Sequence, residues 1–126
     1  MAKEGRLVAV ILEVSDLERS EALYRDAFGL DLHPGDNEVD DRWTGGRHAE
    51  ISWREGAYLH FALYMAKEKP TSGAQIALSV GDIDRAHATA VRAGAQVVHK
   101  PRTELWGRSA RYRDFDGNVI ELTQHT

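Results

Sequence analysis

An internal repeat constrains this sequence more than any other feature. Residues 14–19 (VSDLER) return as residues 80–85 (VGDIDR), an offset of 66 residues from Asp16 to Asp82 in a chain of 126. Solenoid repeats have periods of roughly 20–50 residues, so a repeat of this length indicates two copies of one supersecondary unit. We therefore expect the functional residues to lie where the two copies meet.

Copy one begins with a strand that leads into a helix. Residues 7–14 form an apolar, β-branched run that predicts a strand. Ser15 and Glu18 form a Ser-x-x-Glu capping box, which predicts the start of a helix over 17–28. Gly29 follows at the position where a left-handed residue ends many helices.

Copy two repeats this plan, with a strand over 75–80, a cap at Asp82, a helix over 83–93 and a stop at Gly94. After each helix the sequence changes to short alternating strands separated by turn residues. The predicted strands are 31–32, 50–53 and 58–64 in copy one, and 96–99, 110–113 and 119–123 in copy two. Each copy is therefore predicted to be a βαβββ unit.

The length of the chain allows one hydrophobic core. The sequence has 126 residues, 42% of them hydrophobic, and a copy of about 60 residues is marginally stable alone. We predict a single domain over 1–126, in which repeat one (about 6–66) and repeat two (about 74–126) share their sheet. A charged linker containing Pro and Gly joins them at about 67–73.

Composition excludes several classes of function. The net charge is −4 and the basic residues are scattered, which argues against a nucleic-acid partner. The absence of cysteine excludes disulfides, thiolate nucleophiles and cysteine metal sites. The sequence has no nucleophile elbow, and no apolar run approaches the 18 or so residues of a membrane span. We expect a soluble, cytoplasmic protein with no membrane partner.

The C-terminal motifs carry a family resemblance. Residues 106–108 (WGR) and 113–122 (RDFDGNVIEL), together with two βαβββ copies, resemble the vicinal oxygen chelate superfamily. That superfamily includes glyoxalases, bleomycin-resistance proteins, fosfomycin-resistance enzymes and extradiol dioxygenases. The resemblance implies an α+β fold in which two βαβββ repeats form a curved mixed sheet, an incomplete barrel. It also implies a ligand or metal held inside this cup, often across a homodimer.

The resemblance also implies positions for metal ligands. The ligand position seven residues before each helix-capping Asp falls on Ala9 and Gln75, and the position on the last strand of each copy falls on His60 and Glu121. Ala9 cannot bind a metal. The set His60, Gln75 and Glu121 remains, and suits Zn, Ni, Fe or Mn. The alternative is a metal-free cup in which His60 and Glu121 form a hydrogen-bonded or ionic pair.

Strand alternation adds further residues that face the cup. If the side chain of Ala9 points inward, the period of two directs Ile11 and Glu13 inward as well. The corresponding residues of copy two are Gln75, Ala77 and Ser79. Glu13 lies in an otherwise apolar strand, so it either works inside the cup or reaches solvent at the end of the strand.

Aromatic and basic residues lie in or beside the predicted loops. They are Trp43, Trp53 and Trp106, with Arg108 two residues after the last of them, and Arg47 and His48 beside a Gly-Gly loop. Flat side chains outside the core suit the wall of a pocket for a planar ligand. The alternatives are that Trp106 packs on the opposite sheet and that Arg47 and His48 are simply solvated.

Two classes of function remain, and whether the chain is an enzyme stays open. The first is a metal-independent binding protein of the bleomycin-resistance type, with no cofactor, which sequesters a small molecule in a cup between two subunits. Its predicted ligand-binding residues are Ile11, Trp43, His60, Gln75, Ser79, Trp106 and Arg108. The loss of a metal ligand at Ala9 favours this class.

The second class is a metal-dependent enzyme: a glyoxalase-like lyase or isomerase, a transferase, or a dioxygenase. There one divalent ion is held by His60, Gln75 and Glu121, and the catalytic carboxylates are Glu13 and Glu121. A third possibility is a dimeric domain whose cup is filled by its own side chains. The sequence does not name a substrate, because one fold supports many chemistries.

Overall fold

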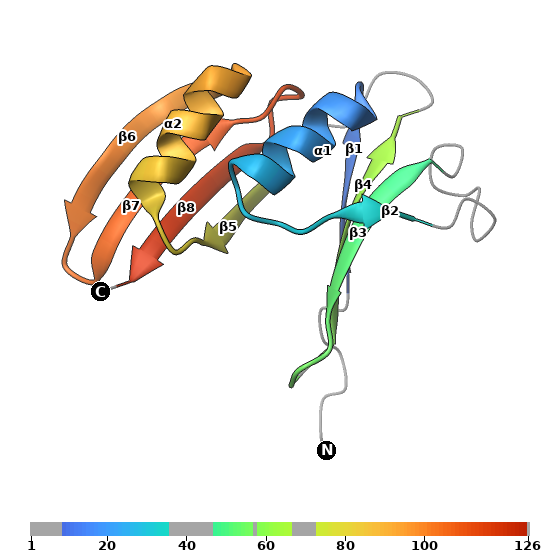
Figure 1. The fold of residues 1–126 in the computed structure, drawn as a ribbon, viewed down its shortest axis with the longest axis horizontal. Helices are drawn as coiled ribbons and strands as arrows, with labels where there is room; N and C mark the ends of the chain where they lie inside the picture. The colour runs from blue at the N-terminus through green and yellow to red at the C-terminus, as the bar shows by residue number, and fades with distance from the viewer. Residues whose placement is uncertain (1–8, 36–46, 57, 67–72, 126) are drawn as a thin grey trace.

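A computed structural model describes residues 9–35, 47–56, 58–66 and 73–125, which form two βαβββ units (Figure 1). Copy one contains β1 (Ala9–Val14), α1 (Leu17–Asp26), β2 (His33–Pro34), β3 (His48–Trp53) and β4 (Leu59–Met65). Copy two contains β5 (Gln75–Ser79), α2 (Ile83–Ala93), β6 (Gln96–Glu104), β7 (Gly107–Arg113) and β8 (Val119–His125). The predicted α+β class and the twofold repeat are confirmed.

Each copy forms its own four-stranded mixed sheet. The strand order is β1-β4-β3-β2 in copy one, called sheet A, and β5-β8-β7-β6 in copy two, called sheet B. In both sheets the first strand runs parallel to the last one, and the other pairs are antiparallel. Among the described residues no strand pairs across the two sheets, which meet at an angle in Figure 1. The expectation of one shared sheet is therefore wrong.

What the two copies share is a hydrophobic core. In Figure 1, α2 lies over sheet B and α1 lies between the two sheets. An aromatic contact joins the copies: Phe28, two residues after α1, lies 5.9 Å from Tyr112 of β7 between ring centroids, and it also packs on Tyr24 of α1 at 5.2 Å. Tyr24, Phe28 and Tyr112 are all fully buried in one cluster. A single core is what a copy of about 60 residues, marginally stable alone, would need.

Both helices begin at an aspartate. The side chains of Asp16 and Asp82 each accept a hydrogen bond at 3.1 Å from the backbone amide three residues later. The capping box predicted for Ser15 and Glu18 is therefore wrong, because the cap is one residue later. Glu18 instead forms an ion pair with Arg47.

Helix ends and strand lengths differ in part from the predictions. Gly94 ends α2 in the left-handed conformation, as predicted, whereas α1 stops at Asp26, two residues earlier than expected. β6 and β7 are longer than predicted, because they form a hairpin that continues through two register shifts. The second half of β6, an edge strand, contains Pro101 and charged side chains, so it lacks the apolar alternation from which strands were predicted.

The turn before β8 fastens copy two to α1. The Asp114 carboxylate accepts a hydrogen bond at 2.7 Å from the hydroxyl of Tyr24, and one oxygen also accepts from the backbone amides of Asp116 and Asn118. Burial, with the Asp114 carboxylate as a further cause, raises the pKa of Tyr24 well above its usual range. The Asp-x-Asp-Gly-Asn motif therefore has a structural role here.

Candidate functional site

Both first strands turn alternate side chains to opposite sides. In β1, Leu12 and Val14 are buried in the core, so Ala9, Ile11 and Glu13 lie on the other side of sheet A. In β5, Ile76 and Leu78 pack against the core, whereas Gln75, Ala77 and Ser79 are exposed. The predicted alternation is confirmed, and the sides away from the core are called the open faces of sheets A and B.

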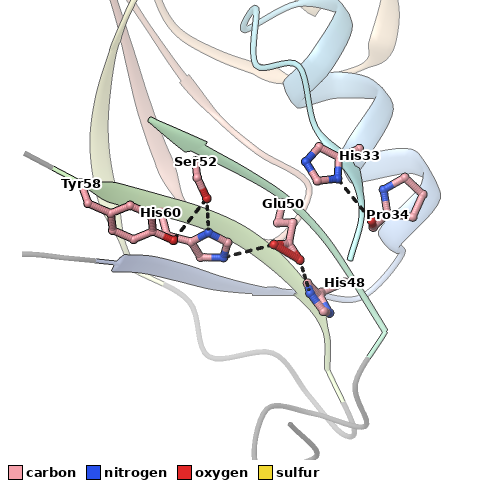
Figure 2. A network of polar contacts seen from close by, with 7 residues as sticks. All are labelled: His33, Pro34, His48, Glu50, Ser52, Tyr58 and His60. Atoms are coloured by element: carbon pink, nitrogen blue, oxygen red, sulfur yellow. Dashed lines mark hydrogen bonds and ion pairs between the residues drawn. The ribbon is translucent and has the colours of Figure 1, made fainter. Parts of the chain in front are cut away.

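A polar network occupies the open face of sheet A (Figure 2). The register pairs Ala9 with His60 and His60 with Ser52, which places them on this face. The Ser52 hydroxyl lies 2.8 Å from His60 Nδ1 and 3.4 Å from the Tyr58 hydroxyl. Glu50 Oε2 lies 3.8 Å from His60 Nε2. Five polar side chains thus follow one another along β3 and β4, ending at His48.

His48 anchors the far end of this network. Its Nε2 lies 2.7 Å from Glu50 Oε1, and its ring stacks on Tyr64 with 4.4 Å between centroids. The side chain is only 5% exposed. The solvated position suggested for His48 is therefore wrong, and Arg47 is held by Glu18 instead of being free for an anionic ligand.

An apolar cavity of about 250 Å³ lies between the two sheets, next to the network. Trp53 is 39% exposed there, so an aromatic ring is available to a ligand. The lining residues are Val10, Trp53, Leu59, His60, Phe61, Ile76, Ala77 and Leu78. His60 is also among the lining residues, but strand alternation turns its side chain to the open face, whereas those of Trp53, Leu59 and Phe61 point to the core side.

A second polar row crosses the open face of sheet B. The register aligns His99, Arg111, Glu121 and Ala77 on four neighbouring strands. Arg111 Nη2 donates to Glu121 Oε1 at 2.7 Å. The Nε of Arg111 and the Nε2 of His99 are buried and have no hydrogen-bond partner within the described part of the chain. These two nitrogens of sheet B are therefore left unsatisfied by the described residues.

The strand registers move one of the implied metal positions. In sheet B, Gln75 pairs with Val119, so Glu121 lies two residues beyond the pairing partner of Gln75. In sheet A, Ala9 pairs with His60, and the residue two positions beyond is Ala62. By register the residue of sheet A equivalent to Glu121 is therefore Ala62, whereas His60 is equivalent to Val119; the metal-binding role implied for His60 stays a prediction.

The donor set does not fit a metal ion. Two of the four corresponding positions are alanine, and of the remaining two Glu121 is held by Arg111. In the described ranges, no three His, Cys, Asp or Glu side chains cluster closely enough to hold a metal. Two protein ligands, one of them an amide, fall short of the three that catalytic zinc sites use.

The predicted pairing of His60 with Glu121 is also wrong. His60 lies beside Ser52 and Glu50 on sheet A, whereas Glu121 bonds Arg111 on sheet B. The prediction of this pair assumed that His60 and Glu121 occupy equivalent positions on the last strands of the two copies. They belong to separate sheets and to different rows, so each finds its partner on its own sheet.

The remaining predicted site residues are spread over the molecule. Ile11 and Glu13 lie on the open face of sheet A, where Glu13 is partly buried, and Gln75 and Ser79 lie on that of sheet B. Trp106, 42% exposed in the β6–β7 turn, contacts the ring of His125 at 5.0 Å. Arg108 bonds Asp84 of α2 at 2.6 Å, so it points toward the helix side. Trp43 falls outside the described residues.

Several residues of the network were missed by the sequence reasoning, although a signal existed. In β3 the polar side chains of His48, Glu50 and Ser52 alternate with Ala49 and Ile51, which is the pattern of a strand with one polar face. The predicted strand began at Glu50, so the pattern was cut short. Arg111 was missed because charged residues in alternation are usually solvated.

Comparisons with known proteins agree with this architecture. A family model described as the glyoxalase/bleomycin resistance protein/dioxygenase superfamily matches residues 6–122. TnmS3, an antibiotic binding protein from Streptomyces sp. CB03234, is similar at 23% identity over 100% of both chains, with a TM-score of 0.62. A glyoxalase/bleomycin resistance protein from Albidiferax ferrireducens T118 has 22% identity over 95% of this chain and 98% of its own, with a TM-score of 0.68. No curated protein matches the chain.

Proposed function

The chain belongs to the glyoxalase/bleomycin resistance protein/dioxygenase superfamily, and on that basis we propose that it binds a small, mainly apolar molecule without a metal ion. The observation that supports this most is the position of His60. His60 takes part in the polar network of sheet A and is also among the residues that line an apolar cavity of about 250 Å³ on the core side of that sheet. Ligand sites typically combine an apolar wall with a few fixed polar groups.

The relatives support binding more than catalysis. TnmS3, which shares the fold, is named as an antibiotic binding protein. In this chain the positions of sheet A that are equivalent by strand register to Gln75 and Glu121 are Ala9 and Ala62, neither of which can bind a metal. Sequestration of the ligand needs only complementary surfaces. An enzyme that polarises its substrate with a metal needs ligands that are missing at Ala9 and Ala62.

We further propose that the binding cup is completed by a second copy of the chain. The edge strands β1 and β5 have no described partner on their outer sides, and unpaired edges tend to be covered. Leu105 is fully exposed in the β6–β7 turn, beside the half-exposed Trp106. A symmetric homodimer buries such liabilities at low cost. Light scattering should give twice the 14.1 kDa mass of one chain, and a monomer at micromolar concentration would contradict the proposal.

Calorimetry with a panel of planar aromatic compounds tests the binding function. We expect at least one compound to bind at micromolar concentration, and Trp53→Ala to weaken that binding about tenfold through loss of apolar contact. Val91→Ala is the control, because Val91 is 49% exposed on α2, far from the cavity lining. Equal binding by both variants would argue against the cavity as the site.

Titration with Zn²⁺, Ni²⁺ and Mn²⁺ tests the metal-independent part of the proposal. The natural protein should show no tight, stoichiometric binding. The double variant Ala9→His, Ala62→Glu should gain affinity, since it restores imidazole and carboxylate ligands at the corresponding positions. Tight binding by the natural protein, abolished by Glu121→Ala, would instead favour a metal-dependent enzyme.

No helix among the described residues is both long and apolar enough to cross a membrane. The cytoplasmic location expected from the sequence stays a prediction.

A further inference from the structure

The polar network of sheet A has a break between Glu50 and His60. Glu50 Oε2 and His60 Nε2 face each other at 3.8 Å, as Figure 2 shows. A hydrogen bond between nitrogen and oxygen needs about 2.7–3.2 Å, so the two atoms do not satisfy each other. The Glu50 side chain is 24% exposed and that of His60 20%, which leaves both within reach of a ligand.

The two side chains that flank the break, Glu50 and His60, are each held in place by another residue. His48 Nε2 binds the other carboxylate oxygen of Glu50 at 2.7 Å, and His48 is itself buried against Tyr64. Ser52 binds the other ring nitrogen of His60 at 2.8 Å. Neighbouring groups already hold the Glu50 carboxylate and the His60 ring. Binding of a ligand between them therefore costs little conformational entropy of these two side chains.

The direction of the hydrogen bonds defines what fits between them. The proton of a neutral His60 ring is favoured on Nε2, because that nitrogen faces a carboxylate, and Nδ1 then accepts from the Ser52 hydroxyl. On one side of the break there is therefore an N–H donor. On the other side there is a carboxylate oxygen, which only accepts.

We propose that a ligand hydroxyl group on an aromatic body binds between His60 and Glu50. Its oxygen accepts from His60 Nε2–H, and its proton is donated to Glu50 Oε2. An oxygen beside the line joining these two atoms can reach both at hydrogen-bond distance. The inference rests on the proposed binding function and adds the chemical class of the ligand, with the half-buried ring of Tyr58, which lies beside His60 in Figure 2, favouring an aromatic body.

Other polar groups satisfy only one side of the break. A methyl ether accepts from His60 but leaves the Glu50 oxygen without a donor. A carboxylate accepts from His60 but is repelled by Glu50, and an ammonium donates to Glu50 but has no lone pair for His60. A site with both a fixed donor and a fixed acceptor discriminates strongly against groups that leave one of them unpaired.

Three probes that share one aromatic body test this proposal: 2-naphthol, 2-methoxynaphthalene and naphthalene, each titrated into the natural protein by calorimetry. We expect 2-naphthol to bind at least about tenfold more tightly than the other two, since a hydrogen bond to a charged group has that effect. Equal affinities for all three would overturn the hydroxyl proposal while leaving the binding function standing.

The variant Glu50→Gln tests whether Glu50 is responsible for the preference for 2-naphthol. It keeps the shape of the side chain but removes the charged acceptor, so the advantage of 2-naphthol should fall to about threefold or less. Glu104→Gln is the matched control, because Glu104 is a similarly exposed strand glutamate paired with Arg102 on sheet B. The control should keep the full preference.

The outcomes separate the two proposals. A preference for 2-naphthol that Glu50→Gln leaves intact would overturn the assignment to the Glu50–His60 break. If none of the three probes binds while another aromatic compound does, the hydroxyl proposal is overturned and the binding function stands. Failure of every aromatic compound overturns both. Thermal unfolding of each variant, recorded beside the titrations, excludes a loss of binding caused by misfolding.

Discussion

The position of His48 depends on a glycine that directly follows the neighbouring strand β2. Gly35, directly after β2, donates its backbone N–H to the His48 carbonyl at 2.8 Å. A Cβ at Gly35 would lie 1.8 Å from His48 Nε2, far inside contact distance. His48 in turn holds the Glu50 carboxylate. The absence of one side chain at Gly35 therefore allows the polar network to take its shape.

Gly35→Ala should destabilise the protein by about 1–3 kcal/mol, because the added methyl group displaces a buried ring. It should also weaken the preference for a ligand hydroxyl, since Glu50 loses its fixed partner. Urea unfolding measures the first effect. Gly81→Ala is the control, because a Cβ there meets nothing within 4 Å, and it should stay within about 0.5 kcal/mol of the natural protein. Equal stability of the two variants would show that His48 adapts freely.

A second residue that joins parts of the molecule is Tyr24. Its buried hydroxyl donates to Asp114 at 2.7 Å, linking α1 to the turn before β8. Tyr24→Phe leaves the Asp114 oxygen without this donor and should cost about 1–3 kcal/mol. Tyr58→Phe removes a hydroxyl with only a 3.4 Å contact and should cost less. Chemical unfolding of both variants decides, and a larger loss for Tyr58→Phe would contradict the assignment.

The helices begin where a local hydrogen bond starts them. Asp16 caps α1 and Asp82 caps α2 with the same geometry, which is why the repeat is most visible at these residues. Asp16→Ala should lower the free energy of unfolding by about 1 kcal/mol. Ser15→Ala should change it by less than about 0.5 kcal/mol, because the described Ser15 contact to Asp116 uses the backbone N–H. Circular dichroism during urea titration measures the free energy of unfolding of both variants. A larger loss for Ser15→Ala than for Asp16→Ala would support the capping box instead.

Helices were predictable here because their signals are local. Residues 83–93 were predicted as a helix and form one, since a cap, an apolar period and a final glycine all lie within thirteen residues of sequence from Asp82 to Gly94. Strand ends depend on partners far away in the chain. β6 continues to Glu104 only because β7 runs beside it, and β2 forms at His33 and Pro34 because β3 offers a partner there.

The candidate site was less predictable than the fold. Alternation placed Ile11, Gln75 and Ser79 correctly on open faces, because it follows from the strand geometry alone. The pairing of His60 depended on strand register, which the repeat offset did not determine. The paired residues are 60 − 9 = 51 positions apart in copy one (Ala9 and His60) and 119 − 75 = 44 apart in copy two (Gln75 and Val119), so the offset of 66 between the first strands does not apply to the last strands.

The shared core makes the whole molecule sensitive to alkaline pH. Tyr112 is fully buried between the sheets and α2, with its hydroxyl 2.7 Å from His87 Nδ1. Burial, with Asp84 as a smaller cause, raises the pKa of Tyr112 to about 12. In the unfolded chain a tyrosine releases its proton near pH 10. Between these values the unfolded chain is deprotonated while the folded protein still holds the proton.

The free energy of unfolding should therefore be unaffected by Tyr112 below about pH 10 and should fall as the pH rises from about 10 to 12. Urea unfolding at pH 8 and pH 11 measures the fall. Tyr112→Phe removes the titrating group, so its fall should be smaller than that of the natural protein, although it starts from a lower stability without the bond to His87. Tyr58→Phe, at a half-buried position on sheet A, should show the same fall as the natural protein. An identical fall in Tyr112→Phe would mean that the alkaline sensitivity arises elsewhere, and Tyr24→Phe would then be the variant to measure, since the pKa of that buried phenol is also raised.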